Sequence, residues 1–224
     1  IKINVDILNK VNGIGEIIVA TRYTNSYVKK GEVIAATRII PLRIEKQQLE
    51  ELEKLVKNEN VMSVKEINTN LKIGLITTGS EIFYGKIKDK SREVLSEKLG
   101  NYNIHDIEQV FVPDEKEKIK ERIMEFEKKK DVIMCTGGMS IDPDDITPSA
   151  IRECGGELIA YGTPVLPGSM FLLAYKGDKV LMGLPGGVIF SPKTVFDLIL
   201  PRVLACDKIT KKDIVEMGHG GMLK

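Results

Sequence analysis

The sequence predicts an α/β fold, a three-layer domain around a mainly parallel sheet that is preceded by a small β-rich segment. After residue 70, short apolar runs alternate with longer helical patterns, as in the crossover units of parallel sheets. One of these runs, DVIMCT at 131–136, is apolar over the length of a strand, which is typical of a strand covered on both faces. Before residue 70, two runs rich in Val, Ile and Thr indicate further strands.

The composition is that of an ordinary globular protein of 224 residues, long enough for one good-sized domain and a smaller one. Its 33 Lys and Arg residues nearly balance 32 Asp and Glu residues, and the lysines are mixed with glutamates along expected helices rather than gathered in a basic stripe. We therefore expect no nucleic-acid partner. No long apolar run and no secretory signal is found, so we expect no membrane partner either.

The three cysteines, Cys135, Cys154 and Cys206, are widely spaced and form no CxxC pair. This usage is typical of a reducing compartment, so we expect a cytoplasmic protein. The chain begins with Ile1 rather than methionine, which suggests that it is a fragment whose first segment is the remainder of a longer N-terminal region.

Residues 1–70 are predicted to form the small β-rich segment with a connecting helix. Strands are expected in EIIVATRY at 16–23 and EVIAATRIIPLRI at 32–44, with a turn at VKKGE between them. A helix is expected at 45–57, where leucines recur at helical spacing. Because no cluster of catalytic residue types occurs here, we interpret the segment as a scaffold.

Residues 71–205 are predicted to form the α/β domain, and residues 206–224 a C-terminal tail. The expected elements of the domain alternate between strands and helices. They are, in chain order, a strand at 71–78, a helix at 91–99, a strand at 107–112, a helix to about 129, a strand at 131–136 and a helix to about 154.

Local signals mark the ends of two of these helices and of a later apolar helix that contains Val195, Phe196, Leu198 and Ile199. Asp114 followed by Glu117 is typical of a capping box that opens the helix to residue 129. Thr147 followed by Pro148 is typical of an N-cap with proline at the first helical position. In the last apolar helix, Pro201 is expected to kink or end the helix.

The stretch CTGGMSIDPDDITP at 135–148 joins an expected strand to an expected helix and carries Asp142, Asp144 and Asp145. In open α/β sheets, ligands bind at loops that follow the carboxyl ends of strands. One carboxylate there would simply favour the helix N-terminus. Three within four positions repel one another, however, and carboxylates are ligands that Mg²⁺ prefers. We therefore expect a magnesium ion bridging these aspartates and a ligand phosphate.

Other expected strand ends resemble this loop. TTGSEIFYGKIKDKS at 77–91 carries a Thr-Gly-Ser turn, and then Glu81 and Asp89. YGTPVLPGSMF at 161–171 and GLPGGVIFSPK at 183–193 each contain a Pro-Gly step, which fixes a turn and lets a ligand approach the backbone closely. Several such turns at strand ends of one sheet indicate a shared ligand site.

These motifs together carry a family resemblance. TTGSEI, GKIKDKS, TGGMSIDPDDITP, LPGSM and GLPGG occur in the order and approximate spacing of the molybdopterin-binding domain of molybdenum-cofactor biosynthesis, over about residues 71–205. The chain thus resembles the molybdopterin adenylyltransferases and molybdenum insertases, of MoaB, Mog and MoeA type, and most of all the stand-alone bacterial molybdopterin-binding proteins. The resemblance implies a three-layer α/β domain, a homo-oligomer such as a dimer or trimer, and a pocket for the pterin dithiolate phosphate with Mg²⁺ and, in the adenylyltransferases, ATP.

Carried over by position, the resemblance assigns roles to residues of each motif. The GGMS turn is closer to the insertase GGVS than to the adenylyltransferase GGTG, and Ser91 replaces the usual asparagine of the insertase motif. The residues implied for catalysis are Asp145, Asp89 and Glu81, and those for Mg²⁺ are Asp142, Asp144 and Asp145. The residues implied for ligand binding are Thr78, Gly79, Ser80, Thr136, Gly137, Gly138, Met139, Ser140, Asp142, Pro167, Gly168, Pro185, Gly186 and Gly187.

Three functions remain open at this point. An enzyme would transfer an adenylyl group through Mg²⁺ at Asp145, or insert the metal with Glu81 and Asp89. A non-catalytic module would bind the cofactor for sensing, storage or delivery and show no nucleotide turnover. A nucleotide pyrophosphatase-like relative on the same fold would act without any pterin. Met139 suits contact with a planar pterin, whereas Cys135 is interpreted as a packing residue.

Overall fold

The structure is a computed structural model that describes residues 1–57, 59–139 and 146–223. The chain divides into two compact units, Ile1–Glu66 and Ile67–Lys224. Each unit has an apolar core of its own.

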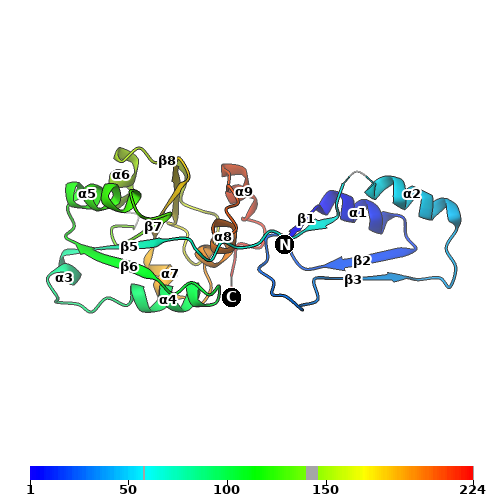
Figure 1. Ribbon diagram of the computed structural model, residues 1–224, viewed down its shortest axis with the longest axis horizontal. Helices are drawn as coiled ribbons and strands as arrows, with labels where there is room; N and C mark the ends of the chain where they lie inside the picture. The colour runs from blue at the N-terminus through cyan, green and yellow to red at the C-terminus, as the bar shows by residue number, and fades with distance from the viewer. Residues whose placement is uncertain (58, 140–145, 224) are drawn as a thin grey trace. The chain divides into compact units, whose positions relative to one another are not determined.

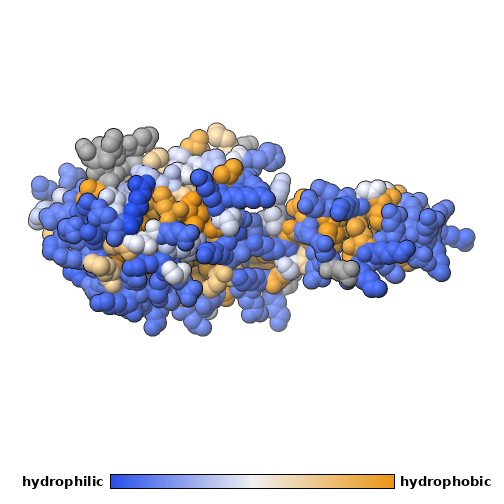
Figure 2. Space-filling view, turned by 90° about the horizontal axis from the view of Figure 1, so that it is seen from above, coloured by the Kyte–Doolittle hydropathy of each residue, from blue (hydrophilic) through white to orange (hydrophobic). Residues whose placement is uncertain are grey.

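The described part of the smaller unit combines two antiparallel strand pairs with helices (Figure 1). Its core cluster is small, with Ile7, Val11 and Ile17 as its buried members. Large apolar side chains also stay at its surface, and Figure 2 shows such apolar patches beside the hydrophilic surface. The elements are β1 Lys2–Ile3, α1 Val5–Gly13, β2 Ile17–Thr21, β3 Ala35–Ile39, α2 Lys46–Val56 and β4 Met62–Ser63.

The strands β2 and β3 and the helix α2 lie within the predicted ranges, but helix α1 was not predicted. It begins after Asn4, whose side-chain oxygen accepts a hydrogen bond of 3.2 Å from the backbone N–H of Ile7. Its buried stripe consists of Ile7 and Val11 alone, because the helix has only nine residues. Two apolar positions at i and i+4 are too few to mark a helix by periodicity.

A six-stranded sheet forms the centre of the larger unit within its described residues. Its strand order is β6, β5, β7, β10, β9, β8. The first four strands are mutually parallel, whereas β9 runs antiparallel to both of its neighbours. The predicted mainly parallel sheet is thus confirmed. The strands are β5 Ile73–Thr78, β6 Ile107–Val112, β7 Val132–Thr136, β8 Glu157–Tyr161, β9 Leu172–Lys176 and β10 Lys179–Leu184.

Helices cover both faces of this sheet and complete the three predicted layers (Figure 1). In β5, Ile73 and Leu75 pack into the core on one face, and Ile76 packs into the core on the other. Helices α4 Ser91–Gly100, α7 Gly186–Phe190, α8 Val195–Leu204 and α9 Lys211–Glu216 contribute to the first core, and α5 Lys116–Glu127 and α6 Ile146–Glu153 to the second. A short helix, α3 Ser80–Phe83, follows β5.

Three helix boundaries differ from the sequence prediction. Glu115, not Asp114, is the N-cap of α5, and no side chain caps it by a hydrogen bond. Helix α6 already contains Thr147, whose hydroxyl donates to the carbonyl of Gly137 at 2.9 Å. Helix α8 continues past Pro201, because the residues after the proline are buried in the core and hold the last turn in place.

Among the described residues, no helix combines the length and the apolar character that crossing a bilayer requires.

Candidate ligand-binding site

A cavity of about 470 Å³ opens at the carboxyl ends of the parallel strands β5, β7 and β10. This is the edge at which open α/β sheets bind their ligands. The segment that leads into helix α4 closes a further side of the cavity. The lining residues are Thr77, Thr78, Ile82, Ile87, Lys88, Asp89, Lys90, Ser91, Thr136, Gly137, Gly138, Met139, Leu184, Gly186, Ile189 and Phe190.

The glycines after β7 let two strand ends approach closely. Gly137 has a φ of +90°, in the left-handed region, and a Cβ placed there would lie 2.3 Å from the carbonyl oxygen of Thr78. Gly138 also has a positive φ, +55°, and a Cβ there would lie 2.9 Å from the hydroxyl oxygen of Thr147. The turn therefore requires glycine for conformation and for space.

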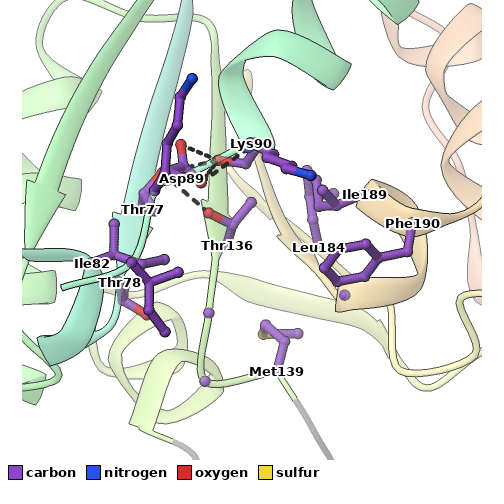
Figure 3. Close-up of a pocket in the computed structure, with 16 residues that line it drawn as sticks. Thr77, Thr78, Ile82, Asp89, Lys90, Thr136, Met139, Leu184, Ile189 and Phe190 are labelled. Carbon is purple, nitrogen blue, oxygen red and sulfur yellow. Dashed lines mark hydrogen bonds between the residues drawn. The ribbon is translucent and has the colours of Figure 1, made fainter. Parts of the chain in front are cut away.

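Hydroxyl groups and one carboxylate form the polar floor of the cavity, which we define as Thr77, Asp89, Ser91 and Thr136. Asp89 accepts hydrogen bonds from the Ser91 backbone N–H at 3.0 Å and from the Ser91 hydroxyl at 2.7 Å. From behind, Gln109 of β6 donates to Asp89 at 2.6 Å and to Thr77 at 2.8 Å. Figure 3 shows Asp89, Thr77 and Thr136 gathered at one end of the cavity.

These hydrogen bonds decide the ionisation of Asp89. Partial burial alone would raise the pKa of the carboxyl group. The donors from Ser91 and Gln109 outweigh burial and lower the pKa of Asp89 below its ordinary value. Asp89 is therefore a fixed negative charge at neutral pH.

The walls of the cavity are mostly apolar. Ile82 and Thr78 lie on one side, and Leu184, Ile189 and Phe190 lie across from them (Figure 3). Phe190 is 81% exposed although it lines the cavity, so its ring stands at the mouth. Two opposed apolar surfaces of this kind suit a flat heterocyclic ring.

Two lysines, Lys88 and Lys90, line the same cavity on either side of Asp89. The Lys90 side chain extends toward Ile189 in Figure 3. Sequence reasoning did not assign a role to these lysines or to Gln109. The motif GKIKDKS holds both lysines, so their signal was present. Gln109 lies inside a strand, where a single polar residue gives no signal of a site.

Comparison with known proteins places the chain in a family. A family model described as "Probable molybdopterin binding domain" matches residues 74–205, which include all residues that line the cavity. The match covers more than half of the chain. The chain belongs to this molybdopterin-binding family.

Two curated relatives carry names from the same biosynthesis. A protein of Methanocaldococcus jannaschii named "Putative molybdopterin biosynthesis protein" is 29% identical over 78% of this chain and 43% of its own length. The Drosophila melanogaster molybdenum cofactor synthesis protein cinnamon is 25% identical over 59% of this chain and 23% of its own length. The chain therefore spans less than half of these curated relatives. The molybdopterin biosynthesis enzyme MoaB from Thermus thermophilus is 23% identical over 62% of this chain and 98% of that one, with a TM-score of 0.49.

The molybdopterin-binding domain brings together part of the site predicted from the sequence. The predicted residues that line its cavity are Thr78, Asp89, Thr136, Gly137, Gly138, Met139 and Gly186. Met139 is nearly buried, and a Cβ at Gly183 would lie 2.5 Å from its terminal methyl carbon, so a glycine in β10 makes room for this side chain. The predicted contact surface for a planar ring thus includes a thioether.

Other predicted residues lie outside the cavity wall. Glu81 is exposed on α3, and its backbone carbonyl accepts from the N–H groups of Lys86 and Ile87, which shapes the loop before Asp89. Gly187 contacts Gly168, since a Cβ at Gly187 would lie 3.2 Å from the Gly168 nitrogen. Predicted residues that are absent from the lining are Gly79, Ser80, Glu81, Pro167, Gly168, Pro185 and Gly187.

The predicted magnesium ligands fall outside the described residues. Asp142, Asp144 and Asp145 belong to residues 140–145, as does Ser140 of the glycine turn. Within the described ranges, no group of three or more His, Cys, Asp or Glu side chains is placed to hold a metal ion. The two ends of the acidic loop are described, and one of them, Met139, lines the cavity.

Two further groups near the cavity differ in what they offer to a ligand. The Thr78 hydroxyl is buried and has no hydrogen-bond partner among the described residues. Cys135 is fully buried in β7, and burial raises the pKa of its thiol to about 12. Its thiolate is therefore not populated at neutral pH, in keeping with a packing residue.

Proposed function

We propose that this cavity binds molybdopterin, the pterin dithiolate phosphate, and that the chain acts on it in molybdenum-cofactor biosynthesis. The observation that carries the proposal is the cavity itself. It has opposed apolar walls, a polar floor and a glycine turn at the carboxyl ends of β5, β7 and β10, inside the region matched by the molybdopterin-binding family. The relatives' names in cofactor synthesis support the same ligand.

The parts of the cavity suit different parts of this ligand. The apolar side chains of Ile82, Ile189 and Phe190 suit the flat pterin ring. Lys88 and Lys90 line the cavity and suit its anionic phosphate, because an ammonium group attracts a phosphate. The unpaired Thr78 hydroxyl offers one more hydrogen bond beside the glycine turn.

We further propose that Mg²⁺ and ATP take part through the acidic loop. The donor set of Asp142, Asp144 and Asp145 consists of carboxylates, which fit a hard cation, and the loop begins directly after the cavity residue Met139. When bound, the ion would neutralise phosphate charge. In contrast, Asp89 is engaged with Ser91 and Gln109 and does not fit as a free metal ligand.

Of the two reactions, the placement of the described residues favours adenylyl transfer to the bound ligand, although the GGMS turn is closer to the insertase motif. Metal insertion assigns roles to Glu81 and Asp89. Glu81 does not line the cavity, and both carboxylate oxygens of Asp89 already accept hydrogen bonds within the protein. Adenylyl transfer requires only that two phosphate-bearing ligands and their counterion be held in place, without a covalent nucleophile.

The first test is equilibrium binding of molybdopterin, followed by fluorescence with and without Mg²⁺. Saturable binding that Mg²⁺ strengthens is expected, and the Asp145→Ala variant should lose the Mg²⁺ effect while keeping its fold. Lys211→Ala, an exposed change on α9, is the control. Absence of molybdopterin binding by the folded wild type would refute the proposed function.

The second test separates catalysis from binding alone. ATP consumption that depends on molybdopterin is expected for an adenylyltransferase. Binding without ATP consumption would identify a storage or delivery module, and hydrolysis of a nucleotide without pterin would identify a pyrophosphatase-like relative.

We also propose that the chain forms a homo-oligomer. Light scattering coupled to size-exclusion chromatography would measure its mass in solution.

A further inference from the structure

A count of hydrogen-bond donors and acceptors decides which group donates in each hydrogen bond of the polar floor. Thr136 donates its hydroxyl hydrogen to the oxygen of Thr77 at 3.2 Å. Gln109 donates one amide hydrogen to the same oxygen at 2.8 Å and the other to Asp89 at 2.6 Å. Thr77 therefore accepts two hydrogen bonds, which use both lone pairs of its hydroxyl.

The remaining contact of the floor, between the Thr77 and Ser91 hydroxyls at 3.3 Å, is fixed by the same count. Ser91 donates its only hydroxyl hydrogen to the carboxylate of Asp89. Thr77 must then be the donor toward Ser91. The hydrogens run from Thr136 through Thr77 and Ser91 to Asp89, and each is used inside the protein.

The side-chain amide of Gln109, which lies outside the cavity lining, fixes the donor and the acceptor of these hydrogen bonds. Its nitrogen faces two acceptors, one of which is a carboxylate, so its oxygen cannot occupy that place without repulsion. Gln109 does not line the cavity itself. It acts on a ligand only by positioning Asp89 and Thr77.

We propose that the floor of the cavity is an acceptor-only surface, which selects the N–H donor edge of a heterocyclic ligand and places any phosphate toward the mouth. All four floor residues line the cavity, and none has a side-chain hydrogen left to give. Thr77 is saturated, so the lone pairs left for a ligand are those of the Thr136 and Ser91 hydroxyls. A ligand group that forms a hydrogen bond with them must therefore donate. The aminopyrimidinone edge of a pterin is such a group, whereas phosphate, carboxylate and carbonyl oxygens are not. This inference rests on the proposed function and adds the orientation of the ligand.

The charge distribution along the cavity agrees with this orientation. Asp89 is a fixed anion at the floor and would repel a phosphate there. The cations that line the cavity, Lys88 and Lys90, flank Asp89 in the chain, and the Lys90 side chain extends away from the floor toward Ile189 (Figure 3). The ring thus enters with its N–H edge first.

The test compares two soluble probes by isothermal titration calorimetry. Pterin carries N–H and NH₂ donors, whereas 1,3-dimethyllumazine has a similar two-ring size but no N–H group. Wild-type protein is expected to bind pterin about tenfold more tightly, the effect of about one or two net hydrogen bonds. Thr136→Val should reduce this ratio by removing one acceptor, while a β-branched residue keeps the strand. Thr136→Ser should restore the ratio.

The outcomes separate the inference from the proposed function. Equal affinity of the wild type for the two probes, or an unchanged ratio in Thr136→Val, would overturn the acceptor-only floor. Binding of molybdopterin without binding of either probe would overturn it as well and leave the proposed function intact. If the wild type binds neither the probes nor molybdopterin, both fail.

Discussion

At the scale of single residues, Gly137 gives the sharpest prediction for the site. Gly137 has a φ of +90°, and an alanine in its place would put a Cβ 2.3 Å from the carbonyl oxygen of Thr78. The end of β5 and the turn after β7 would therefore have to move apart. We expect a loss of at least about 2 kcal/mol in the free energy of unfolding, above the cost of the left-handed backbone alone. Urea denaturation measures it.

A second glycine provides the matched control for this change. Gly177 also has a positive φ, +57°, in the turn between β9 and β10, but a Cβ there meets no atom within 4 Å. Gly177→Ala should therefore cost only the backbone strain, about 1 kcal/mol. Equal losses for Gly137→Ala and Gly177→Ala would show that the close approach of β5 and β7 does not matter.

Gln109 carries the second prediction at this scale, which concerns the ionisation of Asp89. Gln109→Leu removes a donor to the carboxylate, so the pKa of Asp89 should rise. In the wild type the pKa is lowered, so ionised Asp89 stabilises the fold above its unfolded pKa, and this contribution is lost as the pH falls through the folded pKa. Gln109→Leu should lose part of this stabilisation by ionised Asp89. NMR titration of the Asp89 carboxyl carbon measures the pKa directly, and an unchanged value would refute the positioning role.

The sequence pointed to residues of the site where they stand in a motif after an expected strand. The Gly-Gly turn and Asp89 both stand in such motifs, at the strand ends where open α/β sheets bind ligands, and the family resemblance implied the role of Asp89. The hydroxyls of Thr77 and Ser91 were not, since such side chains also occur in turns without a site. Their role depends on Gln109, which comes from a different strand.

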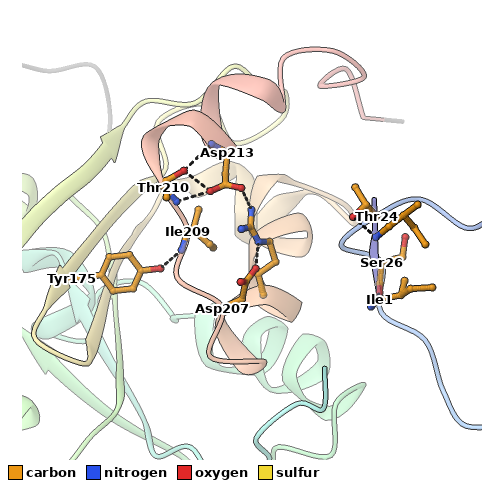
Figure 4. A network of polar contacts seen from close by, with 10 residues as sticks. Ile1, Thr24, Ser26, Tyr175, Asp207, Ile209, Thr210 and Asp213 are labelled. Carbon is orange, nitrogen blue, oxygen red and sulfur yellow. Dashed lines mark hydrogen bonds and ion pairs between the residues drawn. The ribbon is translucent and has the colours of Figure 1, made fainter. Parts of the chain in front are cut away.

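At the scale of elements, the buried guanidinium of Arg202 stabilises the connection between helices α8 and α9. Arg202 is 4% exposed and pairs with Asp207 at 2.8 Å and with Asp213 at 2.9 Å. Asp213 also accepts the backbone N–H of Thr210 at 2.7 Å in a capping box that starts α9 (Figure 4). Burial would raise the pKa of Asp213, but the bonds from Thr210 and Arg202 outweigh it and lower the pKa to about 2.

This lowered pKa predicts how the contribution of Asp213 to the free energy of unfolding depends on pH. Ionised Asp213 stabilises the fold above its unfolded pKa of 3.8, and the contribution disappears as the pH falls from there to about 2. Asp213→Asn should therefore lower the free energy of unfolding by about 2 kcal/mol at neutral pH, because Arg202 stays partly compensated by Asp207. The difference from the wild type should shrink toward pH 2. Glu216→Gln, exposed at the other end of α9, should change little.

The elements that were predicted correctly have dense local patterns. Strand β7 is five consecutive buried residues, and α5 buries Ile119, Ile123 and Phe126 at helical spacing. Of the two outcomes expected at Pro201, an end of the helix is wrong, because tertiary packing buries both flanking turns of α8 and the helix continues. The capping box expected at Asp114 was wrong for a local reason, since two acidic residues, Asp114 and Glu115, precede α5 and the spacing alone does not choose between them.

At the scale of the whole molecule, the two units differ in how much core they build. The larger unit buries apolar residues on both faces of its sheet, whereas the buried apolar residues of the smaller unit's core cluster are Ile7, Val11 and Ile17. Side chains such as Leu42 and Tyr23 of the smaller unit are exposed. Stability grows with the apolar area removed from water, so the larger unit should fold on its own and the smaller one only marginally.

The position of the cavity predicts which part of the chain binds the ligand. Every residue that lines the cavity falls between Thr77 and Phe190, inside the unit Ile67–Lys224. A fragment consisting of that unit should therefore give the dispersed amide NMR spectrum of a folded domain and bind molybdopterin with the affinity of the full chain, within about twofold. The fragment Ile1–Glu66 is the control and should bind none. A folded larger fragment that has lost the ligand would contradict the placement of the site in this unit, whereas retained binding would assign the ligand to the molybdopterin-binding domain alone.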